Sequence, residues 1–294
     1  MTVFLQFLFS GLTIGSVYAL VGLGFNIIYN ATSIINLAQG EFVVIGGLVM
    51  WFFTASVKLP FALAAVLTLF ISGIIALLME RLTIKPLKKT DLLLTIMITV
   101  AVSIVLRGLL MFMFGKEPYG YAPFSEGEPV QIYGAIIQQQ TLWIIGITCS
   151  CIVLIYLFFN RTLLGKAMRA CSVNPTAAKL VGIDVERMVM LSFILSAVMG
   201  AIAGIAITPL SLMEYDRGPM LTVKGFSAAI MGGLGRGRGS VMGGFIIGIL
   251  ESMTAGYIHS GLKDAVALLI MLAVLFFRPA GLFGSKTILH LRKF

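Results

Sequence analysis

The sequence predicts an all-α polytopic membrane protein. A single domain, residues 1–294, is expected to hold roughly eight to nine transmembrane or half-spanning helices and one short cytoplasmic helix. Of the 294 residues, 59% are hydrophobic and 11% are charged, whereas soluble domains carry about 25% charged residues. The apolar runs are long and continuous, as helical spans of about 20 residues require. A membrane β-barrel would instead show alternating segments of about ten residues.

The first two membrane segments are predicted at 4–29 and 35–56. The first has no basic residues ahead of its apolar run and no small-residue cleavage site, so we interpret it as a span and not as a removed signal peptide. The polar stretch 30–41 connects the two segments. If both segments span fully, the amino terminus lies outside; if one is re-entrant, it lies inside.

The later segments are apolar runs bounded by charged loops. They are predicted at 61–79, 92–114, 141–159 and 189–210, followed by a glycine-rich region at 222–257 and a last span at 264–277. Two arginines favour a break at 236–239, between a half-helix and a full span. Broken backbone at membrane depth must be buried in protein or line a cavity, so both irregular regions are functional candidates.

The loops differ in charge, and basic residues collect on the cytoplasmic side of membrane proteins. The basic excess predicts that 80–91, 160–188 and 278–294 are cytoplasmic and that 115–140 and 210–224 are outside. The net charge of +9 follows from this distribution, so no nucleic-acid partner is expected.

Motifs for nucleotide binding and catalysis are absent from the sequence. The stretch GGLGRGRGS at 232–240 superficially suggests a phosphate loop, but no Lys-Ser/Thr pair ends it and membrane segments flank it. His259 and His290 have no carboxylate motif beside them, so neither a catalytic nor a metal site is predicted. The three cysteines are expected to remain unpaired.

Several polar residues lie inside or beside the predicted spans, where an ionisable group is a functional candidate. These are Asn26, Asn36, Gln39, Glu41, Arg107 and Glu251. Glu41 stands near the start of a span, where the helix dipole stabilises a carboxylate, so a structural role is as well supported as a functional one. For Arg107, packing toward a cavity, snorkelling and substrate contact all remain open.

The segment 165–205 closely resembles the coupling region of permease subunits in branched-chain amino acid ABC importers. The matching positions are Gly165, Ala167, Arg169, Ala170, Asn174, Ala177, Ala178, Leu180, Gly182, Ile183, Gly200, Ala203 and Gly204. INLAQGEFVVIGG at 35–47, the glycine-rich 225–251 and FRPAGLFG at 277–284 are similar to further motifs of the family. The resemblance covers almost the whole chain, and the short amino terminus is typical of the H-type (hydrophobic amino acid uptake) subunit.

The resemblance implies a transport subunit that is not an enzyme and binds no cofactor itself. Two permeases, related or identical, would form a pore in the bacterial cytoplasmic (inner) membrane. Two ATPase subunits would bind ATP and magnesium inside, and a solute-binding protein would deliver the substrate outside. The substrate would be a branched-chain or other small amino acid, or a related small polar solute such as urea or a short amide.

The resemblance also implies roles for individual residues. A coupling helix near 175–181 would dock on an ATPase, with coupling residues Gly165, Arg169, Ala170, Asn174, Ala178 and Gly182. Asn36, Gln39, Glu41 and Arg107 are expected along the translocation path or at its gate. Arg107, Arg236 and Arg238 depart from the family pattern. These departures leave the identity of the substrate open. The alternative, an autonomous channel or ion-coupled secondary transporter, needs intramembrane charges for a coupling ion, and the chain offers few.

Overall fold

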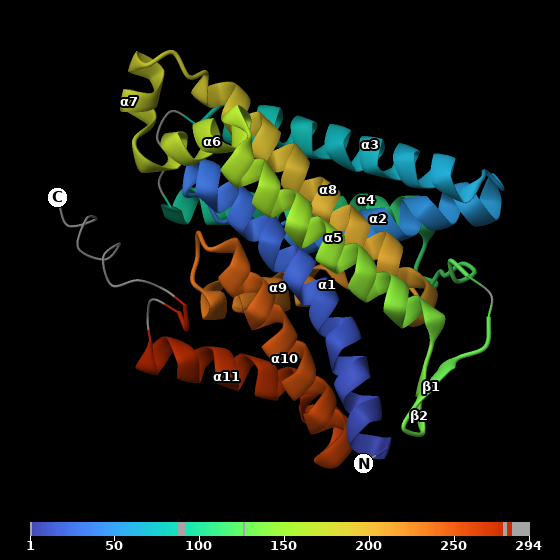
Figure 1. Cartoon of the computed structure of the whole chain (residues 1–294). Helices are drawn as coiled ribbons and strands as arrows, with labels where there is room; N and C mark the ends of the chain where they lie inside the picture. The colour runs from blue at the N-terminus through green and yellow to red at the C-terminus, as the bar shows by residue number, and fades with distance from the viewer. Residues whose placement is uncertain (1, 88–91, 126, 279–280, 284–294) are drawn as a thin grey trace.

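The computed structural model describes residues 2–87, 92–125, 127–278 and 281–283 and confirms an all-α membrane architecture with one short β-hairpin (Figure 1). In this part of the chain, eight helical segments are long and apolar enough to cross a membrane. The elements are α1 (Thr2–Thr32), α2 (Gln39–Trp51), η1 (Phe52–Ser56), α3 (Phe61–Met79), η2 (Glu80–Ile84), α4 (Leu92–Phe114), β1 (Val130–Ile132), β2 (Ala135–Ile137), α5 (Gln139–Arg161), α6 (Leu163–Val173), α7 (Pro175–Leu180), α8 (Val185–Ser211), α9 (Gly218–Gly232), α10 (Gly237–Tyr257), η3 (Ser260–Leu262) and α11 (Lys263–Phe277). Part of the loop 80–91 and most of the tail 278–294, both predicted to be cytoplasmic, lie outside the described residues.

Helix α1 runs through the middle of the bundle and packs most extensively against α10 (Figure 1). This contact depends on glycines of both helices. A Cβ added at Gly11 would lie 2.6 Å from the Cα of Ile249, and one at Gly15 would lie 2.9 Å from the Cα of Phe245. Glycine at these positions lets the two backbones approach closely.

The chain leaves α1 and re-enters the bundle before α2 begins. Residues 33–38 are not helical, so α2 starts at Gln39 and not at 35 as the sequence suggested. Gln39 lies against Gly24 of α1 and Ser196 of α8. At 1.5 Å per residue, these two positions are roughly 12 Å and 16 Å from the nearer ends of their helices. Helix α2 therefore begins deep inside the bundle.

Helix α9 also begins inside the bundle. Residues 212–217 form an irregular connection after α8, and α9 starts at Gly218, earlier than the predicted 222. Its first turn meets that of α2, because a Cβ at Gly40 would collide with the Gly218 carbonyl oxygen. The prediction that 210–224 is an outer loop is wrong for Lys224, which lies within α9 and is buried. The predicted break near 236–239 is present at 233–236, where α9 ends.

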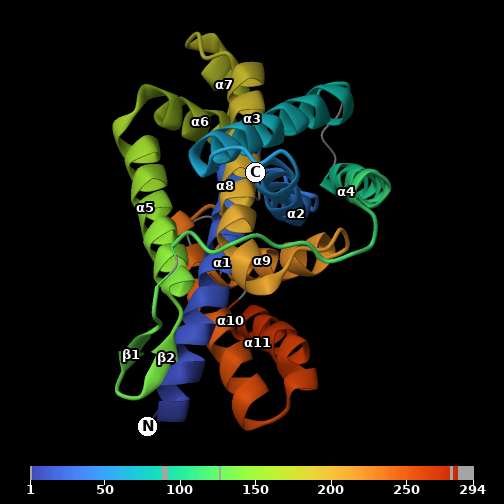
Figure 2. The same ribbon diagram turned by 90° about the vertical axis from the view of Figure 1, so that its right-hand side faces the viewer.

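The two ends of the bundle carry different connections. Helices α6 and α7 project from one end, which we name the α7 end (Figures 1 and 2). The turn at 233–236 lies at the same end, because Arg236 and Arg169 line one pocket. Lys85, after η2, also lies there and pairs with Glu186 at 3.0 Å. The amino terminus and the β-hairpin lie at the opposite end, so α1 spans the bundle and the re-entrant segment follows it.

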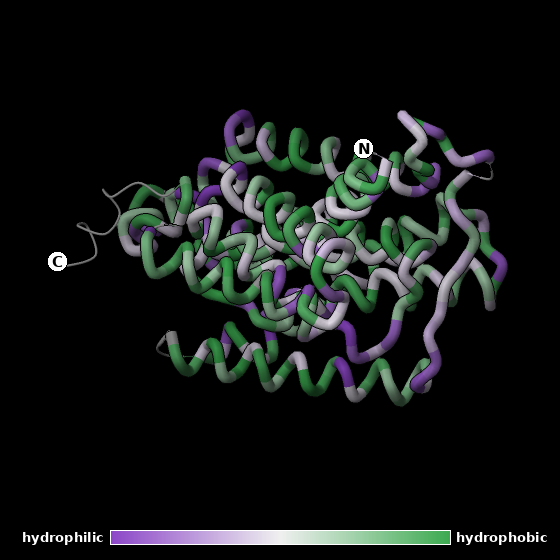
Figure 3. Tube along the Cα trace, turned by 90° about the horizontal axis from the view of Figure 1, so that it is seen from below, coloured by the Kyte–Doolittle hydropathy of each residue, from purple (hydrophilic) through white to green (hydrophobic). Residues whose placement is uncertain are grey.

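Helix α4 lies at the edge of the bundle, where it contacts α2 and α9 (Figure 2). Many of its large apolar side chains are exposed, among them Leu93, Met97, Ile104, Val105 and Phe112. Figure 3 shows hydrophobic residues along the helices and hydrophilic residues mainly near loops and helix ends. An apolar surface of this extent is stable against lipid or against another protein surface.

Candidate functional site

Helix α6 holds three of the predicted coupling residues and is fixed to the end of α5. The Thr162 hydroxyl accepts a hydrogen bond from the Gly165 N–H at 3.0 Å and caps α6. A Cβ at Gly165 would lie 2.6 Å from the Cα of Phe159, so glycine allows the close turn between α5 and α6. The Arg169 guanidinium donates to the Phe159 carbonyl and, at 3.2 Å, to Asn160 Oδ1. Arg169 is exposed, and its hydrogen bonds also hold the last turn of α5.

Helix α7 coincides with the predicted coupling helix and is closed at both ends. The Asn174 side chain accepts from the Ala177 N–H at 3.0 Å, and Pro175 occupies the first turn, where it costs no helical hydrogen bond. Gly182 ends the unit with a φ of +85°, a conformation that favours glycine. Ala178 is buried against the hydrophobic core, so the short helix has a defined inner face.

The exposed side of the α6–α7 unit mixes large apolar residues with basic and polar ones such as Lys166 and Lys179, a feature not predicted from the sequence. Four side chains there are highly exposed: Leu163, Val173, Leu180 and Val181. Leu180 is 85% exposed and Val181 is 77% exposed. Leu180 is the last residue of α7 and Val181 follows it; this helix also carries Lys179 and lies outside the candidate spans. Leu180 and Val181 are adjacent in the chain, and neighbouring exposed apolar residues on a surface outside the membrane make a candidate protein-docking site.

The predicted path residues Asn36 and Gln39 lie in the re-entrant connection and at the start of α2. Gln39 is fully buried; its Nε2 donates to the Ser196 carbonyl at 2.9 Å, and its Oε1 lies 2.6 Å from Ser196 Oγ. Asn36 Oδ1 accepts from the Ala38 N–H at 3.0 Å. Within the described residues, Asn36 Nδ2 is buried without a hydrogen-bond partner.

Glu41 lies where the first turns of α2 and α9 meet. Its Oε1 accepts a hydrogen bond from Ser103 of α4 at 2.7 Å, whereas Oε2 has no hydrogen-bond partner among the described residues. A Cβ at Gly218 would collide with the Glu41 carboxyl group. The amino-terminal ends of both helices favour a negative charge at this point. Arg107 is one helical turn beyond Ser103 on α4 and half-buried, so it approaches this cluster from the side of α4.

A buried ionic cluster connects α9 with α10 and α11. Lys224 Nζ lies 2.7 Å from Glu251 Oε1 and 2.5 Å from Asp264 Oδ1. The Tyr18 hydroxyl donates to Glu251 Oε2 at 2.8 Å. The side chains of Lys224 and Glu251 are 6% and 4% exposed. Ionisable residues inside a membrane domain are normally paired or functional, and here they fix a half-helix to its neighbours.

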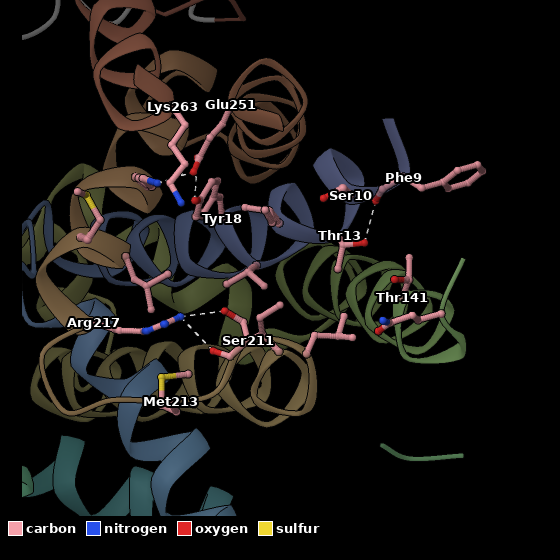
Figure 4. A pocket seen from close by; sticks show the side chains of 18 of the residues that line it. Phe9, Ser10, Thr13, Tyr18, Thr141, Ser211, Met213, Arg217, Glu251 and Lys263 are labelled. Atoms are coloured by element: carbon pink, nitrogen blue, oxygen red, sulfur yellow. Dashed lines mark hydrogen bonds and ion pairs between the residues drawn. The ribbon is translucent and has the colours of Figure 1, made fainter. Parts of the chain in front are cut away.

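This cluster lines a cavity of about 820 Å³ between α1, α5, α8, α9 and α11 (Figure 4). Arg217 and Lys263 reach the same cavity. Arg217 donates to the Ser211 carbonyl and hydroxyl oxygens at 3.0 and 2.8 Å. Apolar residues such as Met220 and Leu221 form much of the remaining wall. The cavity adjoins the irregular connection 212–217, so it opens beside the start of α9.

The structure gathers the predicted residues into two places. The six coupling residues lie in the α6–α7 unit, and three path residues lie together where α2 begins, with Arg107 approaching from α4. Ser103, Gly218 and Thr222 are further neighbours of that cluster and were not predicted from the sequence. Thr222 Oγ1 accepts from the Gly40 N–H at 2.9 Å. No local signal joins residues so far apart in the chain.

Comparisons with known proteins show which family the chain resembles. A family model described as branched-chain amino acid transport system / permease component matches residues 7–275. The chain is 29% identical, over 97% of each chain, to the high-affinity branched-chain amino acid transport system permease protein LivH of Escherichia coli K12. It is 30% identical, over 90% of this chain and 88% of the relative, to the probable branched-chain amino acid transport permease protein LivH of Methanocaldococcus jannaschii. The solved structure of PsaBC from Streptococcus pneumoniae in complex with Fab aligns over 100% of this chain and 96% of that one, with a TM-score of 0.53 and 14% identity. That last similarity is one of fold.

Proposed function

The chain belongs to the family of permease components of branched-chain amino acid transport systems, and we propose that it forms part of the membrane pore of an ABC importer for branched-chain or other small amino acids. Its partners are a second permease, two ATP-binding subunits that hold ATP and magnesium, and an extracytoplasmic solute-binding protein. The membrane is the bacterial cytoplasmic membrane, and the α7 end faces the cytoplasm.

The observation that carries this proposal is the exposed apolar surface of the α6–α7 unit. A membrane protein gains nothing from exposing Leu180 and Val181 to water, because burying such a side chain is favourable by about 1.5–3 kcal/mol. The unit is rigid, since Asn174 and Gly182 close α7 at both ends. A rigid apolar projection is suited to a groove on an ATPase subunit, and we assign Gly165, Arg169, Ala170 and Ala178 to its support.

We place the gate of the path where α2 and α9 meet. Discontinuous helices with their amino-terminal ends near the middle of a membrane domain are typical of transporter binding sites. The contact between Gly40 and Gly218 leaves no room for a Cβ, and this close contact is the closed gate in our proposal. Glu41, Gln39 and Asn36 lie on the α2 side of the closure, and Arg107 is assigned to the α4 side.

A reconstituted transport assay tests the docking surface. The full chain is assembled in proteoliposomes with the other subunits of its own transport system, and uptake of labelled leucine and ATP hydrolysis are measured. The variant Leu180→Asp is expected to lower uptake at least tenfold, because loss of about 1.5 kcal/mol or more of docking energy corresponds to that factor.

Tyr133→Asp is the matched control. Tyr133 is 84% exposed at the tip of the β-hairpin, at the opposite end of the bundle, so this substitution is expected to leave ATP hydrolysis measured without the solute-binding protein unchanged. If Leu180→Asp and Tyr133→Asp lowered ATP hydrolysis equally, docking at α7 would be contradicted. Uptake by the chain alone, without ATPase subunits, would contradict the importer assignment itself.

A further inference from the structure

A second pocket lies at the α7 end and is not used by the proposed transport path. It has a volume of about 500 Å³ and is formed by α1, α5, α6 and the turn between α9 and α10. Its polar lining includes Asn160, Arg169, Arg236 and Arg238. It is of a size that holds a small ligand or a lipid headgroup.

The charge of this pocket is of one sign. Three arginines line it, and none of the described lining residues is acidic. Arg236 donates to the Phe283 carbonyl, and Arg169 donates to oxygens at the end of α5. Arg238 lies with its guanidinium 4.3 Å from the centroid of the Tyr156 ring. Each arginine therefore has a defined contact, but none of the three forms an ion pair with a carboxylate within the described residues.

Backbone groups add to the same preference. Gly237, Arg238 and Gly239 form the first turn of α10, a helix of 21 residues, and all three line the pocket. The first N–H groups of a helix have no partner within the helix and attract anions. Guanidinium groups bind phosphate oxygens in pairs of parallel hydrogen bonds. The arginines and the helix end together form a suitable environment for a phosphate group.

The surroundings of the pocket favour a lipid as the source of that phosphate. The pocket lies at the last turn of α5. The preceding turns of α5 expose the apolar side chains Val153, Leu154 and Leu157. Acyl chains can lie along that face while the headgroup reaches the arginines. Basic pockets between helices on the cytoplasmic side of a membrane bind anionic lipid headgroups.

We propose that the pocket between α5, α6 and the α9–α10 turn binds the phosphodiester headgroup of an anionic phospholipid. Arg236 and Arg238 hold the phosphate, and Tyr156 covers the Arg238 side chain. Because Arg169 belongs to α6, the bound headgroup touches the helix that precedes α7. The proposal concerns a lipid site and is independent of the transported substrate.

Lipid binding to the full chain in neutral detergent tests this proposal. Dioleoylphosphatidylglycerol and dioleoylphosphatidylcholine are titrated separately, and bound lipid is counted by native mass spectrometry. The wild-type chain is expected to bind phosphatidylglycerol at least tenfold more tightly than phosphatidylcholine. The variant R236Q/R238Q is expected to lose about 25-fold in affinity for phosphatidylglycerol, because each basic residue near an anionic lipid is worth about fivefold.

The control variant R161Q/K166Q removes the same charge from exposed positions of α5 and α6 that do not line the pocket. It is expected to change the affinity less than twofold. Equal losses in both double variants, or equal binding of the two lipids by the wild type, would overturn the proposal. If R236Q/R238Q does not fold, the single variant Arg238→Gln is measured instead, because the Arg238 side chain is exposed and its loss should not affect folding. An unchanged affinity of this variant for phosphatidylglycerol would overturn the assignment.

A competition measurement separates a lipid from a soluble phosphate. Glycerol 3-phosphate carries the same phosphate but no acyl chain, so millimolar amounts are expected to displace little phosphatidylglycerol. Displacement at concentrations equal to that of the lipid would show that the site takes a soluble anion and would refute the lipid assignment.

Discussion

The Lys224 cluster offers the sharpest test of how the half-helix α9 is held in place. Lys224→Met keeps most of the apolar stem and removes the charge that faces Glu251 at 2.7 Å and Asp264 at 2.5 Å. Glu251 would then keep only the Tyr18 hydroxyl as its partner in this cluster. Removing one partner of a buried ion pair costs about 3–5 kcal/mol, because the other charge remains buried without compensation.

Asp264 adds less to this cost, since its side chain is 37% exposed and water can replace the lost partner. We therefore expect Lys224→Met to lower the free energy of unfolding by about 3–5 kcal/mol. The measurement is equilibrium unfolding in mixed micelles titrated with dodecyl sulfate. The double variant K224M/E251L removes both buried charges and is expected to recover at least half of the loss, since apolar replacement of a buried pair is often neutral.

Lys263→Met is the matched control, because Lys263 lines the same cavity but forms no ion pair within the described residues. Its effect is expected to stay within about 0.5 kcal/mol, as for most surface substitutions. The role of Lys224 is refuted if Lys224→Met lowers the free energy of unfolding no more than Lys263→Met does. It is also refuted if K224M/E251L is as unstable as the sum of its single variants, because the two residues would then act independently.

Three further predictions address packing, capping and thiol reactivity. Gly204→Val is expected to abolish folded protein in size-exclusion chromatography, because a Cβ there collides with the backbone of α2, whereas Gly146→Val meets open space and is expected to be tolerated. Asn174→Ala removes the cap of α7 at a cost of about 1 kcal/mol and is expected to lower ATP-coupled uptake without changing unfolding of the bundle. Burial raises the pKa of the Cys171 thiol, so its thiolate forms only at higher pH; maleimide labelling is expected to be slower than at a cysteine placed at Ser172, with the difference shrinking as pH rises.

The positions of the spans were predictable because long apolar runs and charged loops are local properties of the sequence. The two internal helix starts were not. The stretch 30–41 showed that the chain is polar between α1 and α2, but not that it turns back into the bundle. The end of α8 and the start of α9 gave even less signal, because the short segment 212–217 resembles an ordinary outer loop.

Lys224 shows why charge alone misleads near such a break. The sequence places Lys224 at the end of a polar loop. In the structure it belongs to α9 and lies next to Glu251 and Asp264. The pairing depends on the packing of α9, α10 and α11, which no local pattern encodes. Arg169 is a similar case, because its hydrogen bonds to the end of α5 follow from the tight turn at Gly165.

Helix α8 joins the proposed docking surface to the proposed gate. It begins at Val185, a few residues after α7, and continues without interruption past Ser196, Gly200 and Gly204. Ser196 holds Gln39 at the start of α2, and a Cβ at Gly200 would lie 2.9 Å from the Phe42 Cβ. Because packed helices move as rigid elements, contacts this close mean that α2 must move together with α8.

A displacement of α7 by an ATPase would therefore reach the first turn of α2 through one continuous helix. The first turn of α9 would follow a different path, since Lys224 ties it to α10 and α11. Movement of α2 relative to α9 would separate Gly40 from Gly218, the contact that we propose as the gate. On this view the ionic cluster serves the transport cycle by keeping α9 still while α2 moves. Loss of Lys224 would then uncouple ATP hydrolysis from uptake even where the protein remains folded.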